Sequence, residues 1–137
     1  MPEPTLYERV GGLAFFEHLV ERFYEGVEGD DILRPLYPVK ADLAPARRRL
    51  ALFLVQYWGG PTTYLQERGH PRLRARHAAY RIGLQERDRW LAHMCAAIDA
   101  SDAGPAERQE LHAYMSLAAD AMINIEALSD SAQGAGL

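Results

Sequence analysis

The segment Glu67–Gly83 reads ERGHPRLRARHAAYRIG, and it concentrates five arginines and two histidines in a chain whose net charge is −4. Such a segment is typical of three different features: a nucleic-acid-binding patch, a solvated helix face, or a site for one anionic cofactor. At helical spacing His77 shares a face with Leu73 and Tyr80, so its imidazole is predicted to point inward. The surroundings of this histidine therefore decide among the three.

The flanks of that face carry Arg72, Arg74 and Arg76. An inward imidazole with cations around it suits a metal inside a large, flat, anionic ligand. Haem has these properties, because its iron takes an axial imidazole and its edge carries two carboxylates. A zinc site has less support, since the sequence has no H-E-x-x-H and Pro71 would interrupt a helix reaching back to His70. The paired Glu-x-x-His motifs of a di-iron bundle are also absent from the sequence.

The composition excludes several other kinds of site and partner. A single cysteine, Cys95, rules out an internal disulfide and a multi-thiolate zinc site, and the lack of C-x-x-C-H rules out a covalent c-type haem. The acidic net charge and the lack of a recognised binding motif argue against nucleic acid. No apolar run approaches the roughly 18 residues of a membrane helix, and the first residues do not resemble a signal peptide. We therefore expect a cytoplasmic protein with no membrane or nucleic-acid partner.

Hydrophobic periodicity predicts an all-α fold. Glycine and proline mark its corners, at Gly11–Gly12 before the first long helix and at Gly59–Gly60–Pro61 after the second. Such corners favour crossed-helix packing over a symmetric up-down bundle. We expect a loop at residues 61–71, one domain over residues 1–128, and a disordered tail at residues 129–137. The predicted helices cover residues 13–27, 45–58, about 72–80, 84–100 and about 105–125, with a short piece at 31–37.

Six sequence blocks occur in one order along the chain: FY at 23–24, LYP at 36–38, YWGGP at 57–61, RGHPRLR at 68–74, RH at 76–77 and RDRWL at 87–91. This order resembles the truncated haemoglobins, specifically their group II branch, from about Leu6 to Ile125. The YWGGP block and the RGHPRLR-x-RH block together are its most specific part. The resemblance implies a shortened globin, in which two antiparallel helix pairs form a two-over-two sandwich around a non-covalent haem b.

The resemblance also implies roles for individual residues. His77 matches the proximal ligand of the haem iron. Tyr24, Tyr37 and Trp90 match the polar cluster over the iron, although aromatic residues on helical stripes are more often ordinary core residues. Ala46 matches the position where many globins place a distal histidine. The link before it is about one residue longer than usual, which leaves that match open to a shift.

Further residues match the cofactor pocket of the family. Arg76, Tyr64 and His70 lie where family members reach the haem propionates. Arg49 either adds a propionate contact or belongs to a solvated helix face, because the run at 47–49 is unusually basic. Leu50 lies one turn after the distal position. The predicted apolar lining consists of Phe53, Leu54, Trp58, Ile82 and Met94.

The chemistry implied is reversible binding of a small ligand such as O2, CO, NO or peroxide. Tyrosine and tryptophan donors already aimed at a ligand stabilise it without reorganisation, so its release is predicted to be slow. Slow release suits redox use or detoxification of reactive species, with dioxygenase- or peroxidase-like turnover and a reductase encoded elsewhere. The alternatives are a simple oxygen-binding or scavenging globin without turnover and a ligand sensor acting through a partner. We expect the protein to be a monomer or a homodimer.

Overall fold

The computed structural model describes residues 3–37, 42–72, 77 and 81–123. Within these residues every regular element is a helix, so the predicted all-α class is confirmed. None of these helices has the length and apolar character that crossing a bilayer requires. The expected tail at 129–137 lies outside the described residues. The elements are α1 (Leu6–Arg9), α2 (Leu13–Glu28), the 3-10 helix η1 (Arg34–Leu36), α3 (Ala44–Tyr57), α4 (Thr63–Arg68), α6 (Leu84–Asp99) and α7 (Pro105–Ala121).

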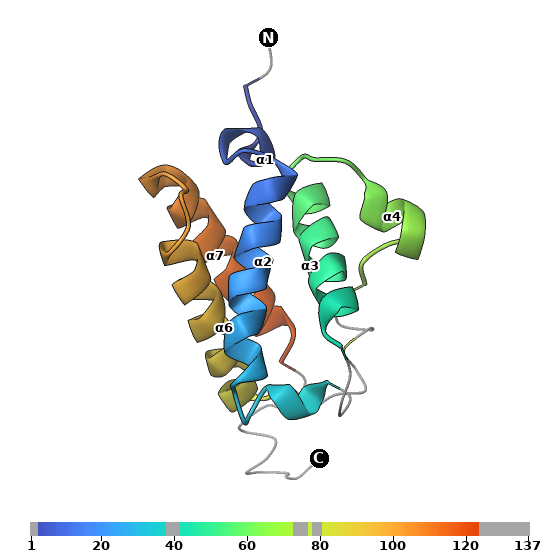
Figure 1. The fold of residues 1–137 in the computed structure, drawn as a ribbon, viewed down its shortest axis with the longest axis vertical. Helices are drawn as coiled ribbons and strands as arrows, with labels where there is room; N and C mark the ends of the chain where they lie inside the picture. The colour runs from blue at the N-terminus through green and yellow to red at the C-terminus, as the bar shows by residue number, and fades with distance from the viewer. Residues whose placement is uncertain (1–2, 38–41, 73–76, 78–80, 124–137) are drawn as a thin grey trace.

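Four long helices form two antiparallel pairs (Figure 1). In the first pair α2 packs against α3, in the second α6 packs against α7, and α2 also packs against α6. Short elements cross the ends of these pairs: α1 lies at the start of α2, and η1 lies below the end of α2 in Figure 1. The arrangement is the two-over-two sandwich that the sequence resemblance implies.

The core follows the periodicity of α2. Its apolar side chains recur at helical spacing and are removed from water, whereas Leu13, the first residue of the helix, is exposed. Side chains from the other three long helices complete this core. The largest fully buried side chains are Phe16, Leu19, Val20, Phe23, Val27, Leu54, Met94, Ile98, Leu111 and Met115.

The predicted glycine corner at the end of α3 is confirmed, and α1 packs into it. Gly59 has a φ of +98°, and a Cβ at this position would come within 2.6 Å of the Thr5 side chain. Both the backbone conformation and the close approach therefore require glycine. Thr5 in turn caps α1 in a capping box with Glu8, and the N–H of Tyr7 donates to the Trp58 carbonyl at 3.1 Å.

The loop predicted for residues 61–71 is wrong, because α4 forms within it. Pro61 and Gly69 lie at the two boundaries of this short helix, so their presence does not break it. Tyr64 is buried on its inner side, and the N–H of Leu65 donates to the Gln56 side chain of α3 at 2.9 Å. Tertiary contacts with α3 thus stabilise a helix too short to form alone.

Candidate functional site: a cavity between the helix pairs

A cavity of about 460 Å³ lies among the long helices. Its volume is typical of a site for a small molecule or cofactor, since such sites span roughly 300–1,000 Å³. Many residues singled out in the sequence line it together. They are Tyr24 of α2, Tyr37 after η1, Ala46, Arg49, Leu50, Phe53 and Leu54 of α3, Tyr64 of α4, His77, Ile82, and Trp90 of α6.

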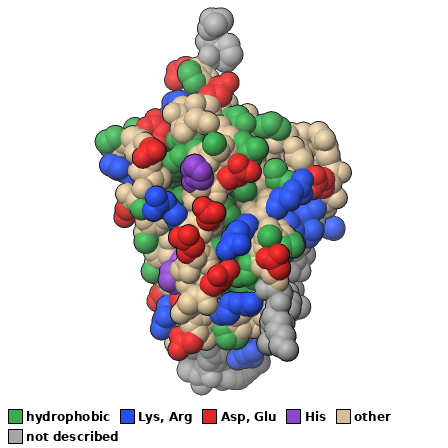
Figure 2. Space-filling view, in the orientation of Figure 1, with side chains coloured by type: hydrophobic (Ala, Val, Ile, Leu, Met, Phe, Trp, Pro, Cys, Tyr) green, Lys and Arg blue, Asp and Glu red, His purple; other side chains and the backbone are tan. Residues whose placement is uncertain are grey.

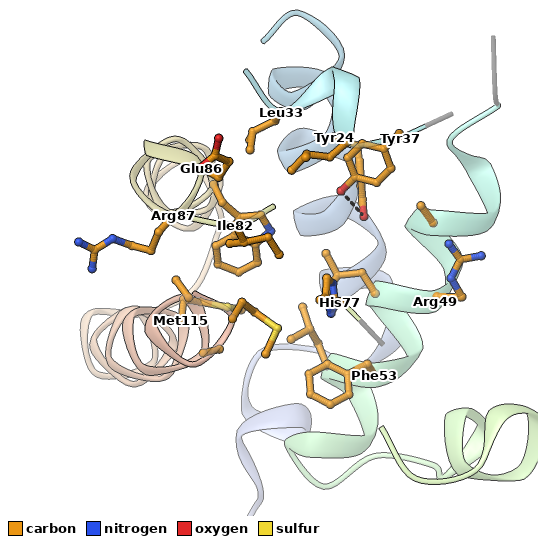
Figure 3. Close-up of a pocket in the computed structure, with 18 of the residues that line it drawn as sticks. Tyr24, Leu33, Tyr37, Arg49, Phe53, His77, Ile82, Glu86, Arg87 and Met115 are labelled. Carbon is orange, nitrogen blue, oxygen red and sulfur yellow. Dashed lines mark hydrogen bonds between the residues drawn. The ribbon is translucent and has the colours of Figure 1, made fainter. Parts of the chain in front are cut away.

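Two tyrosine hydroxyls meet at the wall of this cavity (Figure 3). Tyr37 Oη donates to Tyr24 Oη across 3.5 Å, and the two rings contact edge to face. Burial, reinforced by the neighbouring Tyr37, raises the pKa of Tyr24 far above its ordinary value. The Tyr24 hydroxyl therefore stays protonated, and because it accepts from Tyr37 it keeps its own proton to donate.

The indole of Trp90 reaches the cavity from α6. Its ring packs edge to face on Phe23 with centroids 5.2 Å apart, and Phe23 packs in the same way on Tyr24 with centroids 5.0 Å apart. Phe23 is fully buried, so it fixes the separation of the other two rings. Three hydrogen-bond donors from three different elements thus line one cavity.

His77 is half-buried and brings an imidazole to the same cavity. In Figure 3 it lies among Phe53, Ile82 and the tyrosines. The neighbouring residues 73–76 and 78–80 lie outside the described residues, and with them lies Arg76, which the resemblance assigns to a propionate. Ala46 and Leu50 line the cavity one turn apart on α3.

Cations mark one edge of the cavity. Arg49 of α3 and Arg68 of α4 line it while remaining exposed to solvent. Figure 2 shows blue side chains over the part of the surface where α3 and α4 lie, and acidic ones nearer α2. The other two arginines of the basic run form ion pairs instead, Arg47 with Glu28 at 2.9 Å and Arg48 with Glu67. The run at 47–49 is therefore divided between surface ion pairs and the cavity.

Three predicted site residues lie away from the cavity lining. Met94 is fully buried one turn after Trp90, where it packs in the core. Trp58 is half-buried at the end of α3 and contacts Phe16 and Tyr114. His70 is exposed after α4. The roles assigned to these three by the resemblance have no support from the cavity geometry.

Other cavity residues were missed by the sequence reasoning. Half of them come from one face of α7 and its C-cap residue, where the spacing identified an apolar stripe but not whether the stripe faced the core or a cavity. Arg87, at the start of α6, pairs with Asp88 at 2.7 Å and with Asp120 of α7. Nothing in its local sequence indicates that it lines the cavity. The missed residues are Leu33, Leu36, Arg68, Glu86, Arg87, Tyr114, Met115, Ala118, Ala119 and Met122.

The donor set of this cavity fits a haem. Apolar and aromatic side chains form most of the wall, one imidazole can ligate an iron, and cations at one edge can pair with carboxylates. The cavity also contains two hydrogen-bond donors that a haem does not need, the hydroxyl of Tyr24 and the indole N–H of Trp90. These donors are suited to a small polar ligand.

Comparison with known proteins agrees with this assignment. The model of the bacterial-like globin family matches residues 5–124. The chain belongs to this family. Within it the protein is a group II truncated haemoglobin: it is 38% identical over 118 residues to the group 2 truncated haemoglobin YjbI of Bacillus subtilis, across 86% of this chain and 87% of the relative.

Solved structures of truncated and related haemoglobins superpose closely on this globin. A thermostable haemoglobin from the actinobacterium Thermobifida fusca is 56% identical with a TM-score of 0.86, over 89% of this chain and 98% of that one. A haemoglobin from Bacillus subtilis described as truncated and oxygen-avid is 37% identical with a TM-score of 0.82, over 88% and 100%. Membership of the family implies that this globin binds haem and, through it, small gaseous ligands such as O2.

Proposed function

We propose that this truncated haemoglobin holds one non-covalent haem b through His77 and releases bound O2 slowly, for use in redox chemistry or detoxification. One observation carries the proposal: the hydroxyls of Tyr24 and Tyr37 and the indole of Trp90 line the same cavity as His77. Haem would supply an iron that binds a diatomic ligand reversibly. The chain supplies everything else, namely the ligating imidazole, the dry wall and the donors.

The three donors would contribute differently to holding the bound ligand. Tyr24 is 5% exposed and keeps its proton, so it can donate to a ligand in a site that water scarcely reaches. Trp90 can only donate through its N–H, and Tyr37 orients the Tyr24 hydroxyl. Each such bond contributes about 1–2 kcal/mol, which slows release by roughly 5- to 30-fold. The oxygen-avid relative from Bacillus subtilis is consistent with a cavity of this kind.

The edge of the cavity would hold the propionates. Arg49 lines this edge as an exposed cation, and Tyr64, buried beside it on α4, offers a hydroxyl. Arg68 adds a second cation, although the sequence reasoning did not single it out. Charge pairing here would hold the carboxylates of the cofactor at this edge of the cavity.

Slow release argues against oxygen delivery and for use of the bound ligand within the protein. Repeated oxidation of NO, or reduction of a peroxide, would require electrons from a reductase. The alternative is a globin that binds or scavenges O2 without turnover. Adding NO in excess over haem, with O2 and a chemical reductant present, separates the two, because turnover would form more than one nitrate per haem, whereas a globin without turnover would stop at about one.

Absorption spectra of the purified protein in ferric, ferrous and CO-bound forms test the proposal. We expect the spectra of a protoporphyrin bound through one histidine, and we expect acid–butanone extraction to move the haem to the organic layer. Haem that stays with the polypeptide would contradict non-covalent binding. A protein that neither contains haem nor takes up added haemin would contradict the proposal as a whole.

A further inference from the structure

Asp30 is the charged residue that the described part of the protein buries, with only 4% of its surface exposed. It lies two residues after the end of α2, and its carboxylate accepts four hydrogen bonds. Oδ1 accepts from the backbone N–H groups of Ile32 at 2.8 Å and Leu33 at 3.1 Å. Oδ2 accepts from His93 Nε2 at 2.7 Å and from Arg89 at 3.4 Å. A buried carboxylate persists only with such partners.

These hydrogen bonds keep the Asp30 carboxylate ionised. Burial alone would raise the pKa of Asp30, but the hydrogen bonds from His93 and two backbone groups, with the charge of Arg89, lower it to about 2. An ionised carboxylate can only accept, so His93 carries its proton on Nε2. The Asp30–His93 hydrogen bond therefore joins the segment just after α2 to the middle of α6.

The same carboxylate joins the three elements that carry the donors of the cavity. Tyr24 precedes Asp30 on α2, Tyr37 follows it at the end of η1, and Trp90 lies between Arg89 and His93 on α6. Displacement of α6 from the end of α2 would break the His93 hydrogen bond, and displacement of the segment that leads into η1 would break those from Ile32 and Leu33. We call Asp30, His93 and Arg89 the Asp30 clamp.

Gly26 shows how closely the clamp fits. A Cβ at this position on α2 would come within 2.9 Å of His93 Cγ, and closer still to the nearest ring nitrogen. A glycine inside a helix costs roughly 0.5–1 kcal/mol relative to alanine. Here it makes room for the imidazole, so α2 and α6 approach each other at the level where Asp30 accepts the His93 hydrogen bond.

We propose that Asp30 is a positioning residue, which through His93 sets the placement of Trp90 relative to Tyr24 and Tyr37 and thereby controls how strongly a ligand is held. This inference rests on the proposed function, since it assigns the clamp a role in ligand release. Asp30 itself does not line the cavity. Its influence is carried by helix α6 and by the segment from Ile32 to Tyr37.

A second histidine–aspartate pair on α6 provides a matched control. His112 Nε2 and Asp99 Oδ1 are 2.8 Å apart, nearly the same separation as in the clamp. The Asp99 side chain is 67% exposed, against 2% for Asp30, and this pair joins α6 only to α7. It therefore shares the chemistry of the clamp without its burial or its link to the donors.

The test compares Asp30→Asn, Gly26→Ala and Asp99→Asn in the haem-bound protein. Asparagine retains an oxygen for Ile32 and Leu33 but loses the charge that holds His93, and alanine at 26 displaces the imidazole without removing it. We expect both to raise the O2 dissociation rate at least about fivefold, the equivalent of one hydrogen bond, with a smaller change for CO. Asp99→Asn should leave both rates within about twofold.

The stretching frequency of bound CO separates positioning from general destabilisation, because it reports the polarity around the ligand. It should shift in Asp30→Asn and Gly26→Ala and stay unchanged in Asp99→Asn, whatever their melting temperatures. In a Trp90→Phe background Asp30→Asn should raise the O2 rate less than in the native protein. If Asp30→Asn does not fold, Gly26→Ala decides.

Two negative results lead to different conclusions. Unchanged O2 release in Gly26→Ala and Asp30→Asn, while Trp90→Phe or Tyr24→Phe raises it, would overturn this inference and leave the proposed function standing. Unchanged release in Trp90→Phe and Tyr24→Phe as well would overturn the proposed function and the inference with it.

Discussion

Two parts of the cavity wall differ in how many polar groups they contribute. On one part, donors from α2, the segment after η1, and α6 converge, and the buried Asp30 holds these elements together. On the other part, His77 brings a single imidazole. Several donors can act on one bound ligand, so the loss of one donor should weaken O2 binding only in part. The cofactor has one imidazole available among the described residues that line this cavity, so loss of His77 should weaken haem binding strongly. The two parts should therefore respond differently to substitution.

The largest effect is expected at the imidazole. His77→Gly should raise the rate of haem loss by more than about tenfold, because it removes the imidazole proposed to ligate the iron, and added imidazole should partly restore binding in the space left behind. Haem transfer to an excess of an apoglobin acceptor, followed by absorbance, measures this rate. His70→Gly is the control, since His70 lies outside the cavity lining.

A reversed result would reassign the ligand. Haem loss in His70→Gly or His93→Gly together with normal retention in His77→Gly would mean that His77 is not the axial residue. The contrast between the two parts of the wall would then disappear.

The next effect concerns the free energy of unfolding, to which Asp30 contributes at the part of the wall that carries the donors. Asp30→Asn should destabilise the protein by about 3 kcal/mol at pH 7, because it breaks a buried pair. The pKa of Asp30 is lowered in the folded state to about 2 from an ordinary 3.8, so its stabilisation is present above about pH 4 and is lost as pH falls toward 2. Urea unfolding at pH 7 and pH 3 should therefore give a smaller difference between native and variant at the lower pH.

The exposed pair sharpens this prediction. Asp99→Asn should change the free energy of unfolding by less than about 1 kcal/mol at either pH, since surface ion pairs contribute little. Equal losses in the two variants would show that burial does not distinguish the pairs.

The smallest effect is expected at the cavity edge. Arg49→Gln should raise the rate of haem loss about threefold, because an exposed pair with a propionate contributes less than about 1 kcal/mol. Arg48→Gln, one residue earlier, removes a cation that pairs with Glu67 instead and should leave the rate unchanged. Identical behaviour of the two variants would assign Arg49 to the solvated face of α3.

Apolar periodicity and glycine corners are local signals, and they predicted the long helices. The cavity residues of α2 and α3 came from the family resemblance instead. The sequence did not predict α4, where contacts with α3 stabilise a short helix between Pro61 and Gly69. Nor did it distinguish the α7 residues that line the cavity from those that pack in the core, since both kinds belong to the same apolar stripe of the helix. The T-x-x-E capping box that begins at Thr5 is the local signal for α1, a helix missing from the predicted elements.

The Asp30 clamp could not be predicted from the sequence. Asp30 and His93 are 63 residues apart, and each looks like an ordinary surface residue in its own segment. Only the packing of α2 against α6, with room made by Gly26, brings them together. Long-range polar pairs of this kind follow from tertiary structure and leave no periodic pattern.

Stopped-flow displacement of O2 by CO on the native protein, Tyr24→Phe, Trp90→Phe and the double variant tests the central claim most directly. Each single substitution should raise the O2 dissociation rate by roughly 5- to 30-fold, and CO release should change less because bound CO accepts weaker hydrogen bonds. The double variant should differ from the sum of the two single effects, since the donors share one ligand. Unchanged O2 release in both single variants would contradict the account, and Tyr24 and Trp90 would then be core aromatics.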